Sequence, residues 1–119
     1  MNNSKLQDIK SRSFLFSLRV IKFIESLKKD ITTNVIASQL LRCSTSIGAN
    51  IVEAKSASSR KDFINYYQIA LKSANETRYW ILLLKHANKT HDKITDDILI
   101  EIEEICKILA KSIITLKGR

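Results

Sequence analysis

The sequence predicts an all-α protein, an antiparallel up-down-up-down four-helix bundle formed by one domain of 119 residues. Apolar residues recur at steps of three and four along most of the chain, which is the period of a helix. The chain contains no proline, so long helices are not interrupted. Two glycines and no proline cannot supply the many turns of a β-sandwich or barrel. Apolar residues make up 45% of the chain, which excludes a disordered tail and supplies a core.

The first predicted helix covers about residues 4–28. Ser4 and Gln7 have the spacing of a capping box, in which two side chains satisfy free backbone N–H groups at a helix start. Apolar or small residues follow at alternating steps of three and four, which places them on one seam of a long helix. The seam comprises Leu6, Ile9, Ser13, Phe16, Val20, Phe23 and Leu27. Residues 28–33 are expected to form the first turn.

The second predicted helix covers about residues 34–56, with Thr33 or Asn34 as its N-cap. Only Arg42 and Glu53 are charged between its start and the end of its apolar stripe. A helix that is nearly uncharged on all sides is usually covered on more than one of them. One small bundle cannot cover every face, so we expect a second copy of the chain to cover part of this helix. The apolar stripe comprises Ile36, Leu40, Cys43, Ile47, Ile51 and Ala54.

The third predicted helix covers about residues 59–88. Ser59 and Asp62 have a second capping-box spacing at its start. Small side chains at Ala70 and Ala74 would let a neighbouring helix approach closely. The apolar seam comprises Phe63, Tyr67, Ala70, Ala74, Thr77, Ile81 and Leu84.

The fourth predicted helix covers about residues 95–117. Thr95 is expected to be its N-cap, and Asp96 and Asp97 would place negative charge in the first turn, where the helix dipole favours it. Isoleucines also favour strands, but a segment of this length with a period near 3.5 favours a helix. The apolar stripe comprises Ile98, Ile102, Ile105, Leu109 and Leu116.

The net charge of +8 is unevenly distributed along the chain. Residues 1–30 and residues 59–90 each carry a net charge of +4, whereas residues 31–58 carry +1 and residues 91–119 carry −1. The excess therefore lies on the first and third helices, which are commonly diagonal in an antiparallel bundle. A basic surface attracts the phosphate backbone of RNA or DNA without a sequence code. The alternative is that the charge only serves solubility.

The candidate nucleic-acid-binding residues are long cations on the first and third helices, which can reach backbone phosphates. Some of them could instead pair with Asp8, Glu25 or Asp62 in the same chain. The sequence contains neither the aromatic pattern of an RNA-recognition sheet nor a helix-turn-helix pattern. The candidates are Arg12, Arg19, Lys22, Arg60, Lys61, Lys72 and Arg78.

No catalytic, metal or cofactor site is predicted. His86 and His91 are five residues apart, a poor spacing for two ligands on one helix face, and no Glu-x-x-His pair of a di-iron bundle occurs. No Gly-rich phosphate loop occurs either. Cys43 and Cys106 lie on apolar stripes and are expected to be core thiols.

One group of polar residues interrupts the apolar second helix. Ser46, Asn50 and Glu53 follow one another at steps of four and three, and Glu76 lies on the third helix. We interpret these four residues as a structural polar network that fixes helix register or subunit pairing, since buried carboxylates need partners. The alternative, a ligand or catalytic pocket that uses Glu53 and Glu76, is less favoured because no metal ligand accompanies them.

Three motifs in order carry a family resemblance. They are QLLRCSTSIGANIVEA at residues 39–54, S-x-x-D-F at residues 59–63 and IALKSANETRYW at residues 69–80. With these motifs the chain closely resembles the bacterial four-helix-bundle proteins encoded in intervening sequences of large-subunit ribosomal RNA genes. The likeness covers nearly the whole chain. That superfamily includes the accessory variability protein of diversity-generating retroelements.

The resemblance implies a homopentamer of four-helix bundles arranged as a barrel, with no known enzymatic activity. For the retroelement relatives, it implies binding to nucleic acid through a basic surface and binding to a reverse transcriptase. The family's motif positions are expected to be structural here. They are Ser46, Gly48, Asn50, Glu53, Ala54, Phe63, Ala70, Glu76 and Tyr79.

A cytoplasmic location is expected. The first dozen residues are polar and lack the apolar segment of a signal peptide, and no run of 18 uncharged apolar residues predicts a membrane span. The favoured function is a non-enzymatic pentamer that binds RNA or DNA. The alternative is a protein-interaction scaffold or an accessory subunit for a reverse transcriptase.

Overall fold

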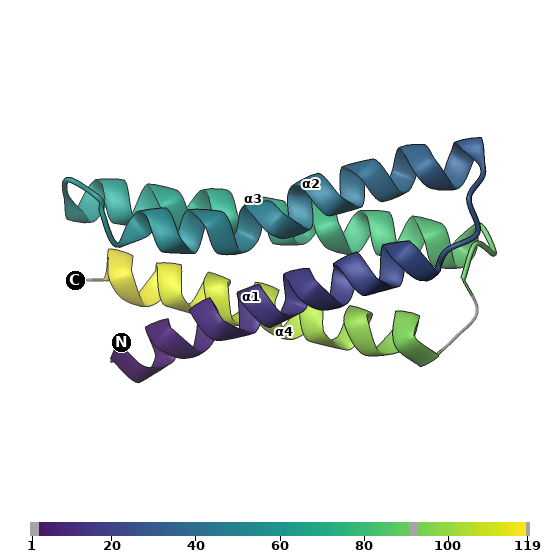
Figure 1. The fold of residues 1–119 in the computed structure, drawn as a ribbon. Coiled ribbons are helices and arrows are strands. Elements are labelled where there is room, and N and C mark those ends of the chain that lie inside the picture. The colour runs from purple at the N-terminus through teal and green to yellow at the C-terminus, as the bar shows by residue number, and fades with distance from the viewer. Residues whose placement is uncertain (1–2, 91–92, 119) are drawn as a thin grey trace.

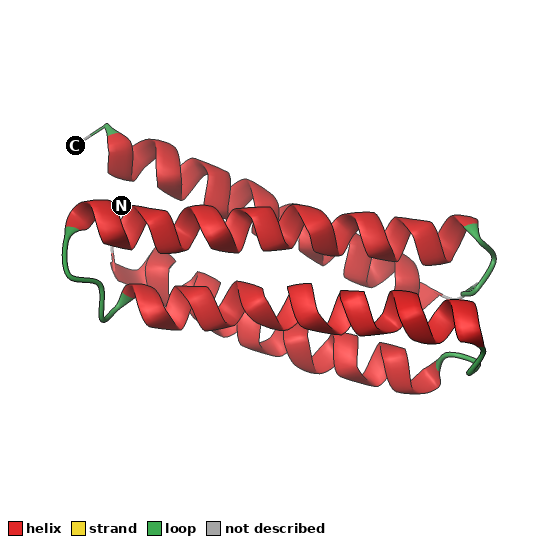
Figure 2. Ribbon diagram, turned by 90° about the horizontal axis from the view of Figure 1, so that it is seen from above, coloured by secondary structure: helices red, strands yellow, loops and turns green. Residues whose placement is uncertain are grey.

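The described part of the chain is entirely helical outside its short connections (Figures 1 and 2). The computed structural model describes residues 3–90 and 93–118, of which residues 3–8 are described as backbone only. The four helices form an elongated bundle of 46 × 23 × 19 Å. The predicted all-helical four-helix bundle is confirmed. Its helices are α1 (Asn3–Ser26), α2 (Ile31–Ala54), α3 (Arg60–His86) and α4 (Lys93–Lys117).

The helices pack around a square. α1 is a neighbour of α2 and α4, and α3 is also a neighbour of α2 and α4, whereas over the described residues α1 and α3 are not adjacent, and neither are α2 and α4. The two most basic helices are therefore diagonal, as expected. The connection from α2 to α3 lies at the same end as the start of α1 and the end of α4, and the connection from α1 to α2 lies at the opposite end (Figure 1).

The predicted seams form the core. Phe16 and Phe23 from α1, Leu40 and Ile47 from α2, and Ile102 from α4 are at most 2% exposed. Small residues of the seams are buried as well, and Ala70 and Ala74 of α3 lie against the other helices with no exposed surface. Over the described side chains, the period of three and four therefore identified the buried face of every helix, although three seam residues near helix ends are only half-buried. The predicted seam residue Leu6 and the capping box of Ser4 and Gln7 lie outside the described side chains. The half-buried seam residues are Leu27, Phe63 and Leu116.

The N-caps of α2 and α4 differ from the prediction. α2 begins at Ile31, and its cap is Asp30, whose Oδ1 accepts a hydrogen bond from the Thr33 backbone N–H at 2.8 Å. Thr33 itself is buried, so the predicted Thr33 or Asn34 cap was wrong. α4 begins at Lys93, and Thr95 lies buried in its first turn with its hydroxyl bonded to that of Thr90. The predicted Thr95 cap was also wrong. The Ser59 cap is confirmed.

The Asp30 cap is held by a contact that is distant in sequence. Lys89, in the connection after α3, donates from Nζ to Asp30 Oδ2 at 3.1 Å. The hydrogen bond from the Thr33 backbone, with help from the Thr33 and Lys89 side chains, lowers the pKa of Asp30 to about 2. Asp30 therefore caps α2 in place of Thr33 or Asn34, because its carboxylate binds both the first turn of the helix and a lysine.

Asp30→Asn is expected to lower the melting temperature at neutral pH but not near pH 2. Because the pKa of Asp30 is lower in the folded chain than its ordinary value of 3.8, the ionised group stabilises the fold above about pH 4, and this contribution is lost as the pH falls through about 2. Thermal unfolding of both proteins between pH 2 and pH 7 measures the difference. Glu25→Gln, on an exposed part of α1, is the control. A difference between wild type and Asp30→Asn that stays constant over this range would contradict the assignment.

Candidate nucleic-acid interface

The square arrangement gives the bundle two opposite faces, one between α1 and α2 and one between α3 and α4. One face is formed by α1 and α2 and exposes large apolar side chains, among them Phe14 and Val52. The opposite face is formed by α3 and α4 and carries exposed lysines, among them Lys61 and Lys117. The cationic face is the candidate interface for nucleic acid.

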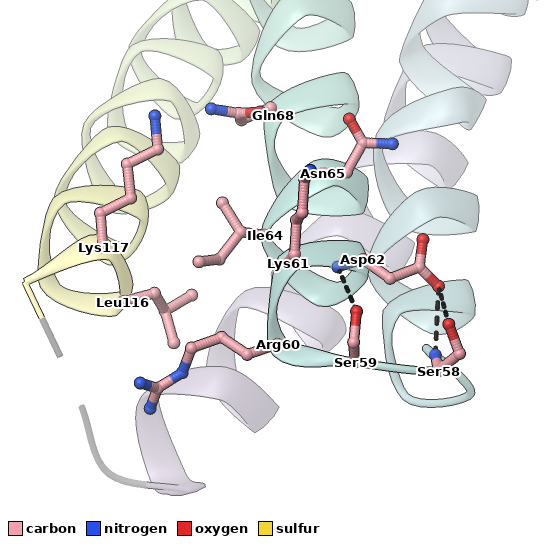
Figure 3. A pocket seen from close by; sticks show the side chains of 10 residues that line it. All are labelled: Ser58, Ser59, Arg60, Lys61, Asp62, Ile64, Asn65, Gln68, Leu116 and Lys117. Atoms are coloured by element: carbon pink, nitrogen blue, oxygen red, sulfur yellow. Dashed lines mark hydrogen bonds between the residues drawn. The ribbon is translucent and has the colours of Figure 1, made fainter.

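A hollow of about 710 Å³ lies between the start of α3 and the end of α4 (Figure 3). Ile64 and Leu116 extend toward each other at its base, and the polar ends of Gln68 and Lys117 lie above them. We call this site the basic hollow. It is lined by Ser58, Ser59, Arg60, Lys61, Asp62, Ile64, Asn65, Gln68, Leu116 and Lys117.

The one carboxylate that lines the basic hollow is engaged elsewhere. Ser59 Oγ accepts a hydrogen bond from the Asp62 backbone N–H at 3.0 Å, which caps α3. Asp62 Oδ2 accepts from the Ser58 backbone N–H at 3.1 Å and from the Ser58 hydroxyl at 3.4 Å. The Asp62 side chain therefore points to the α2–α3 turn, away from Lys117 (Figure 3).

Cations continue from the hollow along α3. Lys61, Asn65, Gln68 and Lys72 follow at steps of four, three and four, which places them on one face of the helix. Within the described residues, no carboxylate lies within salt-bridge distance of Lys61, Lys72 or Lys117. These three lysines therefore keep their positive charge available on this face.

Two of the seven predicted cations are neutralised by α4. Arg12 donates from Nε to Glu101 Oε2 at 3.0 Å and from Nη2 to Glu101 Oε1 at 2.7 Å, a bidentate pair. Arg78 donates from Nε to Glu103 Oε1 at 3.2 Å. Both glutamates lie outside the set of carboxylates that the sequence suggested as partners. Arg12 and Arg78 are consequently weaker candidates for phosphate contacts.

The remaining candidates fall in two separate places. Arg60 and Lys61 line the basic hollow, and Lys72 lies beyond it on α3. Arg19 and Lys22 are exposed on α1, where they line a smaller groove of about 380 Å³ against α4. The structure thus does not gather the predicted cations into one patch on a single chain.

Lys117 is a functional candidate that the sequence reasoning missed. The charge distribution directs attention to the first and third helices, because residues 91–119 carry a net charge of −1. The expected course of the bundle could have found it, since the start of α3 and the end of α4 lie at one end (Figure 1). The local charge at that end differs from the average over the helix.

The predicted polar network forms two clusters and not one. Ser73 Oγ on α3 donates to Ser46 Oγ at 3.0 Å, and Asn50 Nδ2 donates to the same oxygen at 3.0 Å. Glu76 belongs to a different cluster, in which it pairs with Arg42 and accepts from Trp80 Nε1 at 2.9 Å.

Glu53 lies apart from both clusters. It is exposed and lines a groove between α1 and α2, while Glu76 side-chain exposure is 37%. The expectation of buried carboxylates was therefore wrong for Glu53 in this chain. The structure does not bring Glu53 and Glu76 together as a pocket with two carboxylates would require.

A second hollow of about 710 Å³ lies between α1 and α2, and we call it the apolar groove. Phe14 and Leu15 of α1 and Val52 of α2 form its apolar walls and are 65%, 58% and 49% exposed. The sequence reasoning identified the α2 share of this surface and missed the α1 share. Phe14, Leu18 and Ile21 follow at steps of four and three outside the core seam, and this pattern was the available signal.

The thiols belong to helix packing. Cys43 is buried against Thr77, whose hydroxyl lies 3.2 Å from its sulfur, and burial raises the pKa of the Cys43 thiol. Burial also raises the pKa of Cys106, which donates to Asn75 Oδ1 at 3.5 Å. His91 lies outside the described residues. Across residues 3–90 and 93–118, no group of three or more His, Cys, Asp or Glu is placed to hold a metal ion.

Over the described residues, none of the four helices combines the length and the apolar character needed to cross a bilayer.

Comparison with known proteins identifies a family. The family described as 23S rRNA-intervening sequence protein matches residues 5–111. A solved structure of a protein with unknown function from the S23 ribosomal protein family of Bacteroides thetaiotaomicron is 40% identical, with a TM-score of 0.85 over 92% of this chain and 97% of that chain. No protein with a curated description matches the chain. Because the family match spans most of the sequence and the fold agrees, this chain belongs to the 23S rRNA-intervening sequence protein family.

Proposed function

We propose that this protein is a non-enzymatic, cytoplasmic oligomer that binds the phosphate backbone of RNA or DNA through its α3–α4 face. Its gene would lie in a ribosomal RNA intervening sequence or a similar locus, in keeping with its family. The observation that carries the proposal is the basic hollow, where Lys61 and Lys117 flank a cavity whose one carboxylate faces the α2–α3 turn.

The chemistry of the basic hollow suits a phosphate backbone. Lysines act as point charges toward phosphate oxygens, and hydroxyl and amide groups such as those of Ser58, Asn65 and Gln68 add hydrogen bonds. The sequence contains no helix-turn-helix pattern that would direct these groups at base edges. The proposed binding is therefore independent of base sequence and driven by the release of counterions.

The proposed oligomer is a homopentameric barrel of antiparallel bundles. The connections at alternating ends of the molecule support the antiparallel course (Figure 1). The exposed apolar side chains of α1 and α2 support association, since a contiguous apolar surface of this kind marks an interaction site. Association would also bring the separate basic surfaces of several copies into one assembly.

Affinity for a generic RNA or DNA is expected to fall about 40-fold between 50 and 200 mM salt. If Lys61, Lys72 and Lys117 each contact one phosphate, three contacts give a slope of about −2.7 in a plot of log affinity against log salt. Fluorescence anisotropy with labelled oligonucleotides of two unrelated sequences measures the slope and the absence of sequence preference. A salt-independent affinity, or no binding at 50 mM salt, would contradict the proposal.

A second candidate is a protein-interaction scaffold, such as an accessory subunit for a reverse transcriptase. The specific observation in its favour is the apolar groove, which offers a protein partner more than it offers a phosphate backbone. In this case the chain would retain its protein partner after nuclease treatment and in high salt. It would also fail to bind the oligonucleotides.

A further inference from the structure

The basic hollow has an apolar floor beneath its charged rim. Ile64 of α3 and Leu116 of α4 extend toward each other at its base (Figure 3). Both side chains pack against the hydrophobic core, yet both remain only half-buried. A phosphate that contacted the lysines alone would leave this apolar surface in water. The floor therefore suits a ligand that carries an apolar part beside its negative charge.

The polar groups around the floor are available to such a ligand. Lys61 and Lys117 lie on two different helices, and no carboxylate of the described residues pairs with either. In the same part of the chain, nothing forms a hydrogen bond with the side-chain amide of Asn65 or Gln68. An amide both donates and accepts hydrogen bonds, so it can bind the polar edge of any base.

A smaller hollow of about 300 Å³ adjoins the basic hollow. Arg60 and Leu116 line both of them, so the two hollows share a wall. The smaller hollow adds the exposed Lys55 and the half-buried Phe63, whose ring stacks on Tyr67 with the centroids 5.0 Å apart. A second apolar surface with a cation beside it therefore follows the first.

Single-stranded nucleic acid has the features that these two hollows match. Each of its nucleotides carries a negative phosphate, a polar base edge and a flat base face that stacks on apolar or aromatic side chains. In a duplex the bases stack on one another and pair through their edges, so a protein surface meets mostly phosphates and sugars. The volume of the basic hollow, about 710 Å³, is in the range of small-molecule sites. An apolar floor of this kind therefore favours an unstacked base over a duplex.

We infer, on the basis of the proposed function, that the basic hollow binds single-stranded RNA or DNA in preference to a duplex. One unstacked base lies with its face on Ile64 and Leu116, and the neighbouring phosphates contact Lys61 and Lys117. The strand continues past Arg60 into the smaller hollow. Because an apolar floor covers the face of any base, the preference concerns the form of the nucleic acid and not its sequence.

An oligothymidine and an abasic strand with the same number of phosphates test the base contact. Wild type is expected to bind the oligothymidine about 10-fold more tightly, with a similar salt dependence, because only the base is missing from the abasic strand. Competition against one labelled oligonucleotide, followed by fluorescence anisotropy, measures both affinities. Equal affinities would overturn the inference.

A duplex of oligothymidine with oligoadenosine provides the second comparison. Electrostatic attraction alone favours the duplex, because it has the higher density of phosphate charge. The base contact is expected to reverse this order, so the single strand should bind about 5-fold more tightly than the duplex of equal length. Tighter binding of the duplex would overturn the inference.

Leu116→Ser assigns the base contact to the hollow. The variant should lose about 5-fold in affinity for the oligothymidine and keep its affinity for the abasic strand, since the lysines are unchanged. Ile114→Ser, at an isoleucine of α4 that is 72% exposed and lines neither hollow, is the matched control and should bind both strands like wild type. Circular dichroism verifies folding. If Leu116→Ser does not fold, Leu116→Phe keeps the floor apolar and should bind the oligothymidine at least as tightly as wild type.

The outcomes separate this inference from the proposed function. A wild-type protein that binds none of the three probes at 50 mM salt would overturn both. Binding with no difference between the oligothymidine and the abasic strand would leave the proposed backbone contacts and overturn the inference alone. An unchanged preference for the oligothymidine in folded Leu116→Ser, or weaker binding of it by folded Leu116→Phe, would also overturn the inference alone.

Discussion

Neutralising Lys61 and Lys117 together is expected to lower the affinity for RNA or DNA about 60-fold at 0.1 M salt. Each phosphate contact contributes about 0.9 to the slope of log affinity against log salt, so two contacts contribute about 1.8. Over the tenfold interval between 0.1 M and 1 M salt, a slope of about 1.8 corresponds to a change in affinity of about 60-fold. The variant Lys61→Gln with Lys117→Gln should therefore also show a slope that is shallower by about 1.8. Anisotropy titrations at several salt concentrations measure both quantities.

The matched control removes the same charge from the opposite end of the bundle. Lys28 and Lys29 are exposed in the connection between α1 and α2, far from the basic hollow along the long axis (Figure 1). Lys28→Gln with Lys29→Gln should change the affinity much less. Equal losses in both double variants would mean that net charge and not the hollow determines binding.

Phe16→Ala is expected to lower the free energy of unfolding by about 3–5 kcal/mol. Phe16 is 1% exposed on the core seam of α1, so its removal leaves a cavity that the surrounding helices fill incompletely. A loss of this size is a large part of the stability of a small domain. Urea unfolding followed by circular dichroism measures the difference.

Ile114→Ala is the control for this truncation. Ile114 is 72% exposed on α4, and its replacement should change the free energy of unfolding by less than about 0.5 kcal/mol. A small effect of Phe16→Ala, similar to that of Ile114→Ala, would contradict the assignment of the α1 seam to the core.

Much of the fold followed from hydrophobic periodicity because burial depends on which face of a helix a residue occupies. The same local reasoning succeeded at Ser59, where the cap and its partner Asp62 are three residues apart. It failed at Asp30, whose second partner Lys89 lies 59 residues away. Caps that depend on tertiary contacts cannot be identified from the residues beside them.

The candidate site was only partly predictable for a related reason. Composition indicated the basic character of α3, and Lys61 belongs to the basic hollow. The pairing of Arg12 with Glu101, 89 residues later, depends on the relative shift of α1 and α4 along the bundle. The relative shift of two helices cannot be read from a single sequence. The sequence therefore could not show which cations pair with carboxylates and which remain available for phosphate. The position of Lys117 across from α3 depends on such a shift as well.

The location of the basic hollow at the end of α4 has a consequence for protein synthesis. A growing polypeptide on the ribosome completes α1, α2 and α3 before Leu116 and Lys117 are added. α1 then still lacks its neighbour α4, and the pair between Arg12 and Glu101 cannot form. The hollow proposed to bind phosphate therefore forms only after the last turn of α4 has been synthesised, later than the rest of the lysine-bearing surface of α3.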